Sequence, residues 1–325
     1  MPELYLPENK TFDYDDIILV PQKCIVKSRS EVSTTATLGG REFALPVVPA
    51  NMSTIVNEDT CEWLATRNIF YVMHRFSIDS VAFTKKMQAK GLYASISLGI
   101  KQVDYDTVDQ FKAEGVTPEY ITIDVAHGDS DEVIRVVRYV KENLPDSYVI
   151  AGNIATINAA LRLQEAGADA VKVGIGPGSA CLTAPNTGFG SHGWQLSALA
   201  DIAEKLRGKV QIIADGGIRQ YGDIAKSVAF GADLVMIGGF FAGHDENPGE
   251  LLEIDGEFKK AFFGSASEHQ KGEHKHVEGK KMFMPYKGSL DTTLQIIKEN
   301  LQSSVSYAGG RDLSALHNVS YTFVR

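Results

Sequence analysis

The chain contains little cysteine and no paired cysteine motif. Its 325 residues include only three cysteines, widely spaced and without any Cys-x-x-Cys pair. These features argue against a disulfide framework and a structural zinc site, so we expect a protein of the reducing cytoplasm. His269, His274 and His276 follow no usual spacing of metal ligands, and we expect no metal ion there.

Long apolar runs and excess positive charge are also missing. No hydrophobic segment approaches the roughly 20 residues of a membrane helix, and residues 1–10 do not have the pattern of a signal peptide. The net charge of −9 disfavours a nucleic-acid groove, because a phosphate backbone requires a basic face. We therefore expect a globular protein that binds a small molecule and has neither a membrane nor a nucleic acid as partner.

Short β-branched runs alternate with amphipathic helical patterns along the chain. Apolar residues recur at helical spacing in residues 131–142, 157–166 and 224–230. Eight runs are apolar enough to be buried on both faces of a parallel sheet: residues 45–50, 69–73, 93–98, 120–125, 147–151, 170–174, 210–214 and 234–237.

Eight strand–helix units over this length predict an α/β protein, a single (β/α)8 TIM barrel that spans residues 1–325. The alternative, an open doubly wound sheet, requires a Gly-x-Gly-x-x-Gly turn after the first strand, which the sequence lacks. We expect residues 1–44 to form an N-terminal extension with a hairpin. The long gap after the sixth strand predicts an active-site loop, and residues 264–288 predict a mobile flap after the eighth strand, without regular structure.

One cysteine lies in a glycine-rich loop directly after the sixth strand. Gly174, Gly176 and Gly178 precede Cys181, and Thr183 follows two residues later. Glycines let the backbone turn sharply and approach a ligand closely, and a partly exposed thiolate in such a loop is a nucleophile. The alternative for a free cysteine is a small buried hydrophobe, which does not need this loop. The pattern therefore predicts a catalytic cysteine.

Two Gly-Gly pairs follow the seventh and eighth strands, at residues 216–217 and 238–239. Barrels often bind a phosphate between these two loops through backbone N–H groups, whereas the alternative is two tight turns. Asp215 precedes the first pair and is suited to a pair of ribose hydroxyls, so we predict a nucleotide ligand. Asp124 ends the fourth strand, as a site residue or a helix N-cap, and Arg75 is a candidate for a second anionic ligand.

Three motifs resemble the IMP dehydrogenase and GMP reductase family. They are residues 172–181 (Lys-Val-Gly-Ile-Gly-Pro-Gly-Ser-Ala-Cys), 214–218 (Ala-Asp-Gly-Gly-Ile) and 235–243 (Val-Met-Ile-Gly-Gly-Phe-Phe-Ala-Gly). The similarity extends from Phe12 to the C-terminus. Residues 124–128 (Asp-Val-Ala-His-Gly) resemble the reductase branch of this family.

Two absences also favour the reductase branch. The second and third expected strands are too close in sequence to hold the regulatory modules that dehydrogenases usually carry there. Dehydrogenases also use an Arg-Tyr pair on the flap to activate water, and no arginine lies between Phe263 and Gly288. The alternatives are an IMP dehydrogenase that makes XMP with NAD, and a non-catalytic nucleotide-binding regulator.

The resemblance implies an NADPH-dependent reductive deamination of GMP to IMP and ammonia, in purine salvage. It implies that Cys181 forms a covalent thioimidate with the purine, and that Thr183 and Glu278 supply the proton for the departing amine. The implied nucleotide-binding residues are Ser179, Asp215, Gly216, Gly217, Gly238, Gly239, Gly264 and Gly279. The implied cofactor-binding residues are Ser28, Arg29, Arg75, Asp124, Val125, Ala126, Ile175, Gly176, Ser303, Ser304 and Ser306.

The resemblance also implies a homotetramer, in which a neighbouring subunit supplies the three serines at the end of the cofactor set. A potassium ion is implied on the backbone carbonyls of Gly176, Gly178 and Cys181. The sequence departs from the family at three positions: Leu182 stands where relatives commonly have threonine, and Ala184 and Lys275 stand where relatives have arginine.

Overall fold

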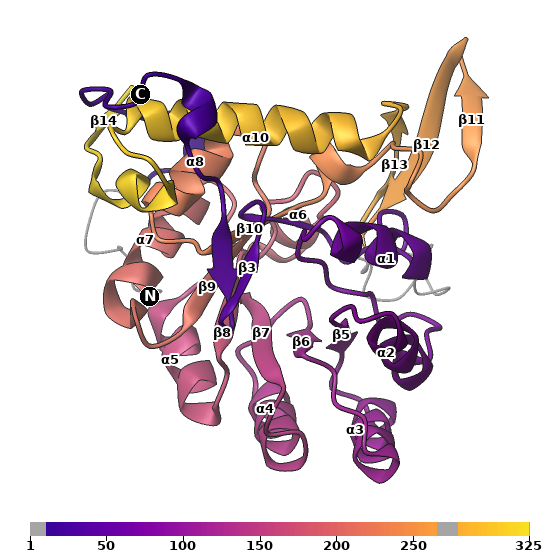
Figure 1. Ribbon diagram of the computed structural model, residues 1–325. Coiled ribbons are helices and arrows are strands. Elements are labelled where there is room, and N and C mark those ends of the chain that lie inside the picture. The colour runs from indigo at the N-terminus through magenta and orange to yellow at the C-terminus, as the bar shows by residue number, and fades with distance from the viewer. Residues whose placement is uncertain (1–10, 265–278, 325) are drawn as a thin grey trace.

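A curled, seven-stranded parallel sheet forms the centre of the molecule, with strand order β4-β10-β9-β8-β7-β6-β5 (Figure 1). The computed structural model describes residues 11–264 and 279–324. Every neighbouring pair of strands in this sheet is parallel. The strands are β4 (Val47–Pro49), β5 (Ser95–Leu98), β6 (Tyr120–Asp124), β7 (Tyr148–Ile154), β8 (Ala170–Val173), β9 (Gln211–Asp215) and β10 (Leu234–Ile237).

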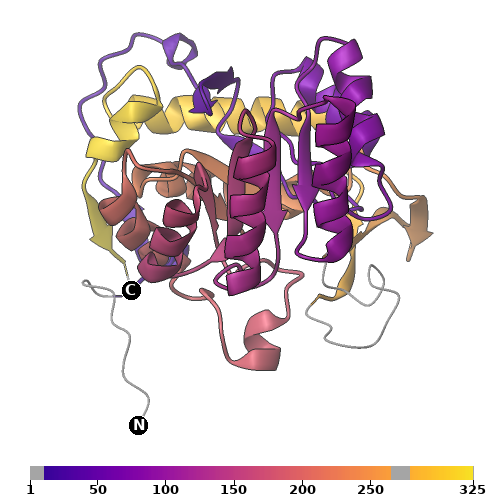
Figure 2. The same cartoon turned by 90° about the horizontal axis from the view of Figure 1, so that it is seen from below.

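Helices from the middle of the chain pack on the outer face of the curled sheet (Figure 2). The three helical predictions are confirmed, and α4 buries the valine stripe that predicted it. No helix in the described ranges is long and apolar enough to span a bilayer. The helices are α1 (Glu58–Thr66), α2 (Ser80–Ala89), α3 (Gln102–Glu114), α4 (Asp131–Asn143), α5 (Ile157–Ala166), α6 (Thr183–Thr187), α7 (Gln195–Leu206), α8 (Tyr221–Ala229) and α10 (Leu290–Tyr307).

The second expected strand, residues 69–73, is not a strand, which corrects the prediction of eight. The segment is buried along its length. The Met73 N–H donates to the carbonyl of Ser95 at the start of β5 (3.0 Å). The segment therefore lies beside the edge of the sheet without a continuous ladder of backbone bonds.

Side-chain hydroxyls satisfy two carbonyls of this segment in place of such a ladder. The Tyr93 hydroxyl donates to the carbonyl of Ile69 (2.7 Å), and the Ser97 hydroxyl donates to the carbonyl of Met73 (2.7 Å). Buried backbone carbonyls need a partner, and side-chain donors satisfy them as well as a neighbouring strand does. Apolar content alone cannot distinguish this arrangement from a strand.

Two short antiparallel pairs involve the first part of the chain. β1 (Ile17–Leu19) pairs with β14 (Tyr321–Phe323). The hairpin of β2 (Ala36–Leu38) and β3 (Arg41–Phe43) crosses the amino ends of the parallel strands. There, the hydroxyl of Tyr120 donates to the carbonyl of Leu38 (2.9 Å).

A three-stranded antiparallel sheet, projecting at the upper right of Figure 1, was not predicted from the sequence. It consists of β11 (Leu251–Ile254), β12 (Glu257–Phe263) and β13 (Lys281–Pro285). β13 lies inside residues 264–288, so part of the expected flap is a regular strand. The pairing of β13 with β12 is set across residues far apart in sequence, which a local pattern cannot reveal.

Candidate active site

A cavity of about 820 Å³ opens at the carboxyl ends of the parallel strands. Loops after β4, β6, β8, β9 and β10 converge on it, as expected for an α/β protein of this kind. The predicted site residues that line it are Arg75, Asp124, Val125, Ala126, Ile175, Gly176, Gly178, Ser179, Cys181, Thr183, Asp215, Gly216, Gly217, Gly238, Gly239, Gly264 and Gly279.

Another group of predicted residues lies outside this cavity. Arg29, in the 3₁₀ helix η2 (Arg29–Glu31), donates from Nη1 to the Ser303 hydroxyl of α10 (3.1 Å). The chain therefore gathers its predicted cofactor residues at two places. The group outside the cavity consists of Ser28, Arg29, Ser303, Ser304 and Ser306. Glu278 lies outside the described residues.

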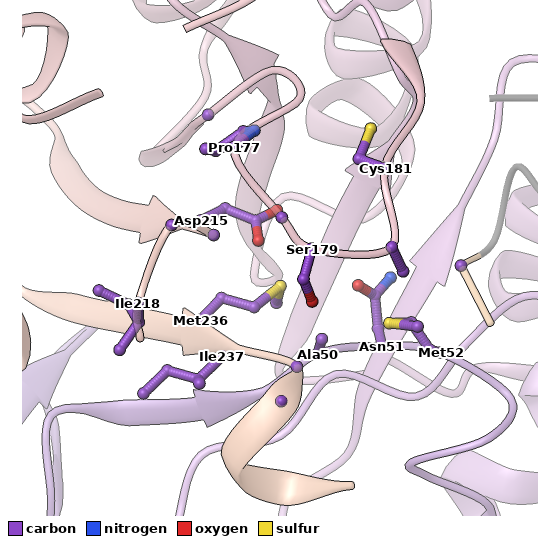
Figure 3. A pocket seen from close by; sticks show the side chains of 18 of the residues that line it. Ala50, Asn51, Met52, Pro177, Ser179, Cys181, Asp215, Ile218, Met236 and Ile237 are labelled. Atoms are coloured by element: carbon purple, nitrogen blue, oxygen red, sulfur yellow. The ribbon is translucent and has the colours of Figure 1, made fainter. Parts of the chain in front are cut away.

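Residues 174–183, the cysteine loop, carry the predicted nucleophile out of the end of β8. Figure 3 shows Cys181 and Ser179 on this loop, with Asp215 and Asn51 on the segments beside it. The Cys181 side chain is half-buried, and its Sγ lies 3.1 Å from the hydroxyl oxygen of Thr183. The thiol is thus accessible from the cavity and adjacent to a hydroxyl that can transfer a proton.

The cysteine loop is fixed by backbone contacts with two other segments. The N–H of Lys280 donates to the carbonyl of Ala180 (3.0 Å) beside an isolated β-bridge between Cys181 and Gly279. On the other side, a Cβ at Gly216 would lie only 3.0 Å from the Pro177 ring, and the φ of Gly216 is +88°. A side chain there would be strained and would push the loop away.

A buried lysine joins two predicted carboxylates at the cavity wall. Lys172 is 2% exposed, and its Nζ lies 2.9 Å from Asp124 and 2.7 Å from Asp215. The Asn51 amide donates to Asp124 (3.1 Å), and the Asn153 amide donates to Asp215 (2.7 Å). Each carboxylate therefore has both a cation and an amide as partners.

The charges of this network stabilise one another. Burial disfavours the ammonium of Lys172, but the facing carboxylates of Asp124 and Asp215 outweigh burial and raise the pKa of Lys172. Burial likewise disfavours the carboxylate of Asp124, yet the charge of Lys172 keeps the pKa of Asp124 below its usual value. Lys172 and Asp124 are thus both charged at neutral pH.

Arg75 presents an unsatisfied donor in the same wall. Its buried Nε has no hydrogen-bond partner in the part of the chain that the structure describes. Its guanidinium carbon lies 5.0 Å from the centre of the Phe76 ring. A buried donor without a partner costs about 1–3 kcal/mol, so an acceptor group on a bound molecule would relieve this cost.

The polar residues of the site that were missed as candidates from the sequence include Asn51, Asn153, Lys172 and Lys287. Lys172 did leave a signal, because a lysine inside an otherwise apolar, buried strand requires charged partners. Lys287 follows β13, and its Nζ donates to the carbonyl of Gly239 (2.7 Å). No local pattern marked Lys287, since its contact depends on the unpredicted sheet.

The chain is similar to known proteins over nearly its whole length. A family model described as the IMP dehydrogenase / GMP reductase domain matches residues 11–325. A protein of Staphylococcus saprophyticus named GMP reductase is 57% identical over 317 residues, which cover 97% of this chain and 96% of the relative. A GMP reductase of Variovorax paradoxus is 58% identical over 313 residues, or 95% of each chain. A third, from Acidovorax ebreus, is 57% identical over 316 residues, or 96% of each chain.

Proposed function

The chain belongs to the IMP dehydrogenase / GMP reductase family, and on this premise we propose that it is a GMP reductase that converts GMP to IMP and ammonia with NADPH. One observation carries the proposal: the Cys181 thiol and the Thr183 hydroxyl lie 3.1 Å apart in a cavity that also contains both Gly-Gly turns. A nucleophile, a proton donor and an anion-binding wall thus face one space.

The nucleotide is proposed to bind with its phosphate against the glycine turns after β9 and β10. Backbone N–H groups at such turns suit a phosphate. Asp215 shares one carboxylate oxygen, Oδ2, with Lys172 and Asn153, which leaves its other oxygen to accept from a ribose hydroxyl. The remaining proposed contacts of the nucleotide are Ser179, Gly264 and Gly279.

Cys181 then adds to C2 of the purine as a thiolate. Thr183, assisted by Glu278, transfers a proton to the amino group at C2, and the C2–N bond breaks to release ammonia. The product of this step is a thioimidate on Cys181. After C2 has been reduced, the C2–S bond breaks, and its electron pair returns to the sulfur as IMP leaves.

NADPH supplies the hydride when it is bound. The unpaired Nε of Arg75 lies in the cavity wall with Asp124, Val125 and Ala126, and it fits an acceptor group of such a cofactor. Ile175 and Gly176 are the proposed contacts on the cysteine loop. A potassium ion on the carbonyls of Gly176, Gly178 and Cys181 remains a prediction, and no step depends on it.

The group of residues at η2 and α10 supports a proposal about assembly. Ser28, Arg29 and the serines of α10 do not line the cavity of their own chain. We infer that a neighbouring subunit presents them to the cofactor, in a homotetramer of the cytoplasm. Sedimentation at several protein concentrations measures the number of subunits, and a monomer at assay concentrations would contradict this assembly.

We further infer that the seven strands close into a single (β/α)8 barrel across residues 1–325. The buried segment 69–73, hydrogen-bonded to β5 through Met73, would occupy the eighth position. Residues 1–44 would then form the N-terminal extension, and residues 264–288 the flap over the cavity. The two edge strands of the sheet are β4 and β5, and this segment would lie between them and close the sheet.

The proposed activity is tested by two assays run side by side. GMP with NADPH should oxidise the nicotinamide, whereas IMP with NAD should give no comparable rate, because the flap lacks an arginine to activate water. NADH in place of NADPH tests the cofactor choice. A faster reaction with IMP and NAD would identify a dehydrogenase and overturn the proposal.

Cys181→Ala should abolish turnover, because no thioimidate can form, while GMP still binds. The matched control is Cys61→Ala, since Cys61 is buried in the core and does not line the cavity. Intact-protein mass spectrometry after incubation with GMP should detect an adduct in Cys61→Ala and none in Cys181→Ala. A regulator without catalytic activity would form no adduct in either variant.

The proton relay is tested separately from binding. Glu278→Gln and Thr183→Val should slow the release of ammonia by at least about 100-fold, because general acid catalysis typically contributes that much. The affinity for GMP, measured by calorimetry, should change far less. Equal losses in ammonia release and affinity would refute the relay.

A further inference from the structure

His244 is a fully buried histidine directly behind the wall of the cavity. It follows the 3₁₀ helix η3 (Gly239–Phe241), which starts in the second glycine turn, residues 238–241. Its Nε2 lies 2.9 Å from the carbonyl oxygen of Phe240, and its Nδ1 lies 3.1 Å from the carbonyl oxygen of Gly288. The side chain thus connects the turn to the end of the β11–β13 sheet.

Both ring nitrogens of His244 face carbonyl oxygens, which can only accept. A neutral imidazole has one N–H, so it can satisfy one of the two carbonyls. Each carbonyl also accepts from a second donor, Gly288 from the N–H of Asp245 (3.1 Å) and Phe240 from the ammonium of Lys287 (3.3 Å), but the contact of His244 to Phe240 is the shorter one. The geometry therefore favours Nε2 as the donor, and Phe240 as its acceptor.

The carbonyls of the second glycine turn are held from two directions. Lys287 donates from Nζ to Gly239 (2.7 Å) and to Phe240 (3.3 Å), while His244 approaches Phe240 from the protein interior. Thr293, which lines the cavity, has its hydroxyl 3.2 Å from the same Nε2. Because a peptide unit is planar, the Phe240 carbonyl shares its plane with the N–H of Phe241, which donates to the carbonyl of Gly238 (3.1 Å), so these contacts hold the turn in one conformation.

We propose that His244 is a positioning residue for the anionic group of the substrate: its Nε2–H donates to the Phe240 carbonyl and so fixes the second glycine turn. The inference rests on the proposed function for the identity of that group, a nucleotide phosphate. His244 itself does not line the cavity and touches no substrate. Burial and the Phe240 contact are consistent with this indirect role.

Two conservative variants distinguish the contact at Nε2 of His244 from the contact at Nδ1. Gln places an amide N–H near the position of Nε2, and therefore His244→Gln should retain the Phe240 contact. Asn places its amide N–H near the position of Nδ1, and therefore His244→Asn should lose it. His317→Gln, at an exposed histidine remote from the cavity, is the matched control.

The kinetic result should separate KM from kcat. We expect His244→Asn to raise the KM for GMP about 10-fold, the effect of one lost hydrogen bond, with kcat within about 3-fold. His244→Gln and His317→Gln should both stay within about 3-fold of the wild type in KM. Equal effects of the Asn and Gln variants, or an unchanged KM in both, would overturn the proposal.

Hydrogen exchange tests the contact between His244 and Phe240 without measuring turnover. Peptides that cover residues 238–247 should exchange faster in His244→Asn than in His244→Gln, and inorganic phosphate should slow this exchange in wild type and His244→Gln more than in His244→Asn. If wild type shows no GMP-dependent oxidation of NADPH, the proposed function fails, but hydrogen exchange still shows whether His244 holds the glycine turn. Equal exchange in the two variants would overturn it.

A measurement on the wild type does not depend on whether any variant folds. Labelling the protein with ¹⁵N-histidine reveals by NMR which ring nitrogen of His244 carries a proton, with His244→Gln used for assignment. A protonated Nε2 supports the proposal. An Nε2 without a proton at the pH of the assay overturns it.

Discussion

Lys172→Met removes the cation between two carboxylates and should destabilise the protein strongly. Lys172 is 2% exposed and contacts Asp124 and Asp215 at 2.9 and 2.7 Å. Removing one partner of a buried ion pair typically costs about 3–5 kcal/mol, because the remaining charge stays buried. Each carboxylate keeps an amide donor, from Asn51 or Asn153, so the loss should be at the lower end, about 3 kcal/mol.

Urea unfolding at one fixed protein concentration measures this loss. Lys86→Met is the matched control, because Lys86 also contacts a carboxylate, Glu58, at 2.9 Å, but the two side chains are 36% and 40% exposed. An exposed pair contributes about 0–1 kcal/mol. If Lys172→Met loses no more stability than Lys86→Met, the reasoning about the buried network is wrong.

Two other predictions concern stability. Gly174→Ala should lower the free energy of unfolding in urea by more than about 1 kcal/mol, because the added Cβ would lie 2.0 Å from the Asp215 carbonyl oxygen and the φ of residue 174 is +145°. The control Gly222→Ala, in open space within α8, should stabilise slightly. Burial lowers the pKa of His74 below its unfolded value of 6.5, so the stability that the neutral ring contributes is complete above pH 6.5 and is lost as the pH falls from there through the lower folded pKa. The urea midpoint should therefore fall between about pH 7.5 and about pH 5.5, and less in His74→Asn, whose side-chain oxygen can still accept the Phe76 N–H without titrating. Equal slopes in both proteins would contradict this assignment.

The parallel sheet was largely predictable because its strands are locally distinctive. β8 and β10 are short, apolar and buried on both faces, and each is followed by glycine residues at the cavity. A loop with three glycines before Cys181 predicted a nucleophile, and the structure places this cysteine at the cavity. These signals are contained within about ten residues of sequence, which pattern reading resolves well.

The features that were missed depend on partners distant in sequence. The hydroxyl of Tyr93 satisfies the carbonyl of Ile69 in the segment 69–73, and no pattern within that segment contains this information. β13 alternates partly buried and exposed side chains over five residues, too few to identify a strand within a polar region. The partners of Lys172 lie 48 and 43 positions away, so only the fold brings them together.

The pairing of β1 with β14 has a consequence for synthesis. Residues 17–19 are translated long before their partners, residues 321–323. Until then Phe12 also lacks the rings of Tyr321 and Phe323, whose centres both lie 5.6 Å from its own. Residues 17–19 must therefore stay without their final partners while the residues in between are translated, and a ribosome stalled before residue 321 would hold a chain in which this pair has not formed.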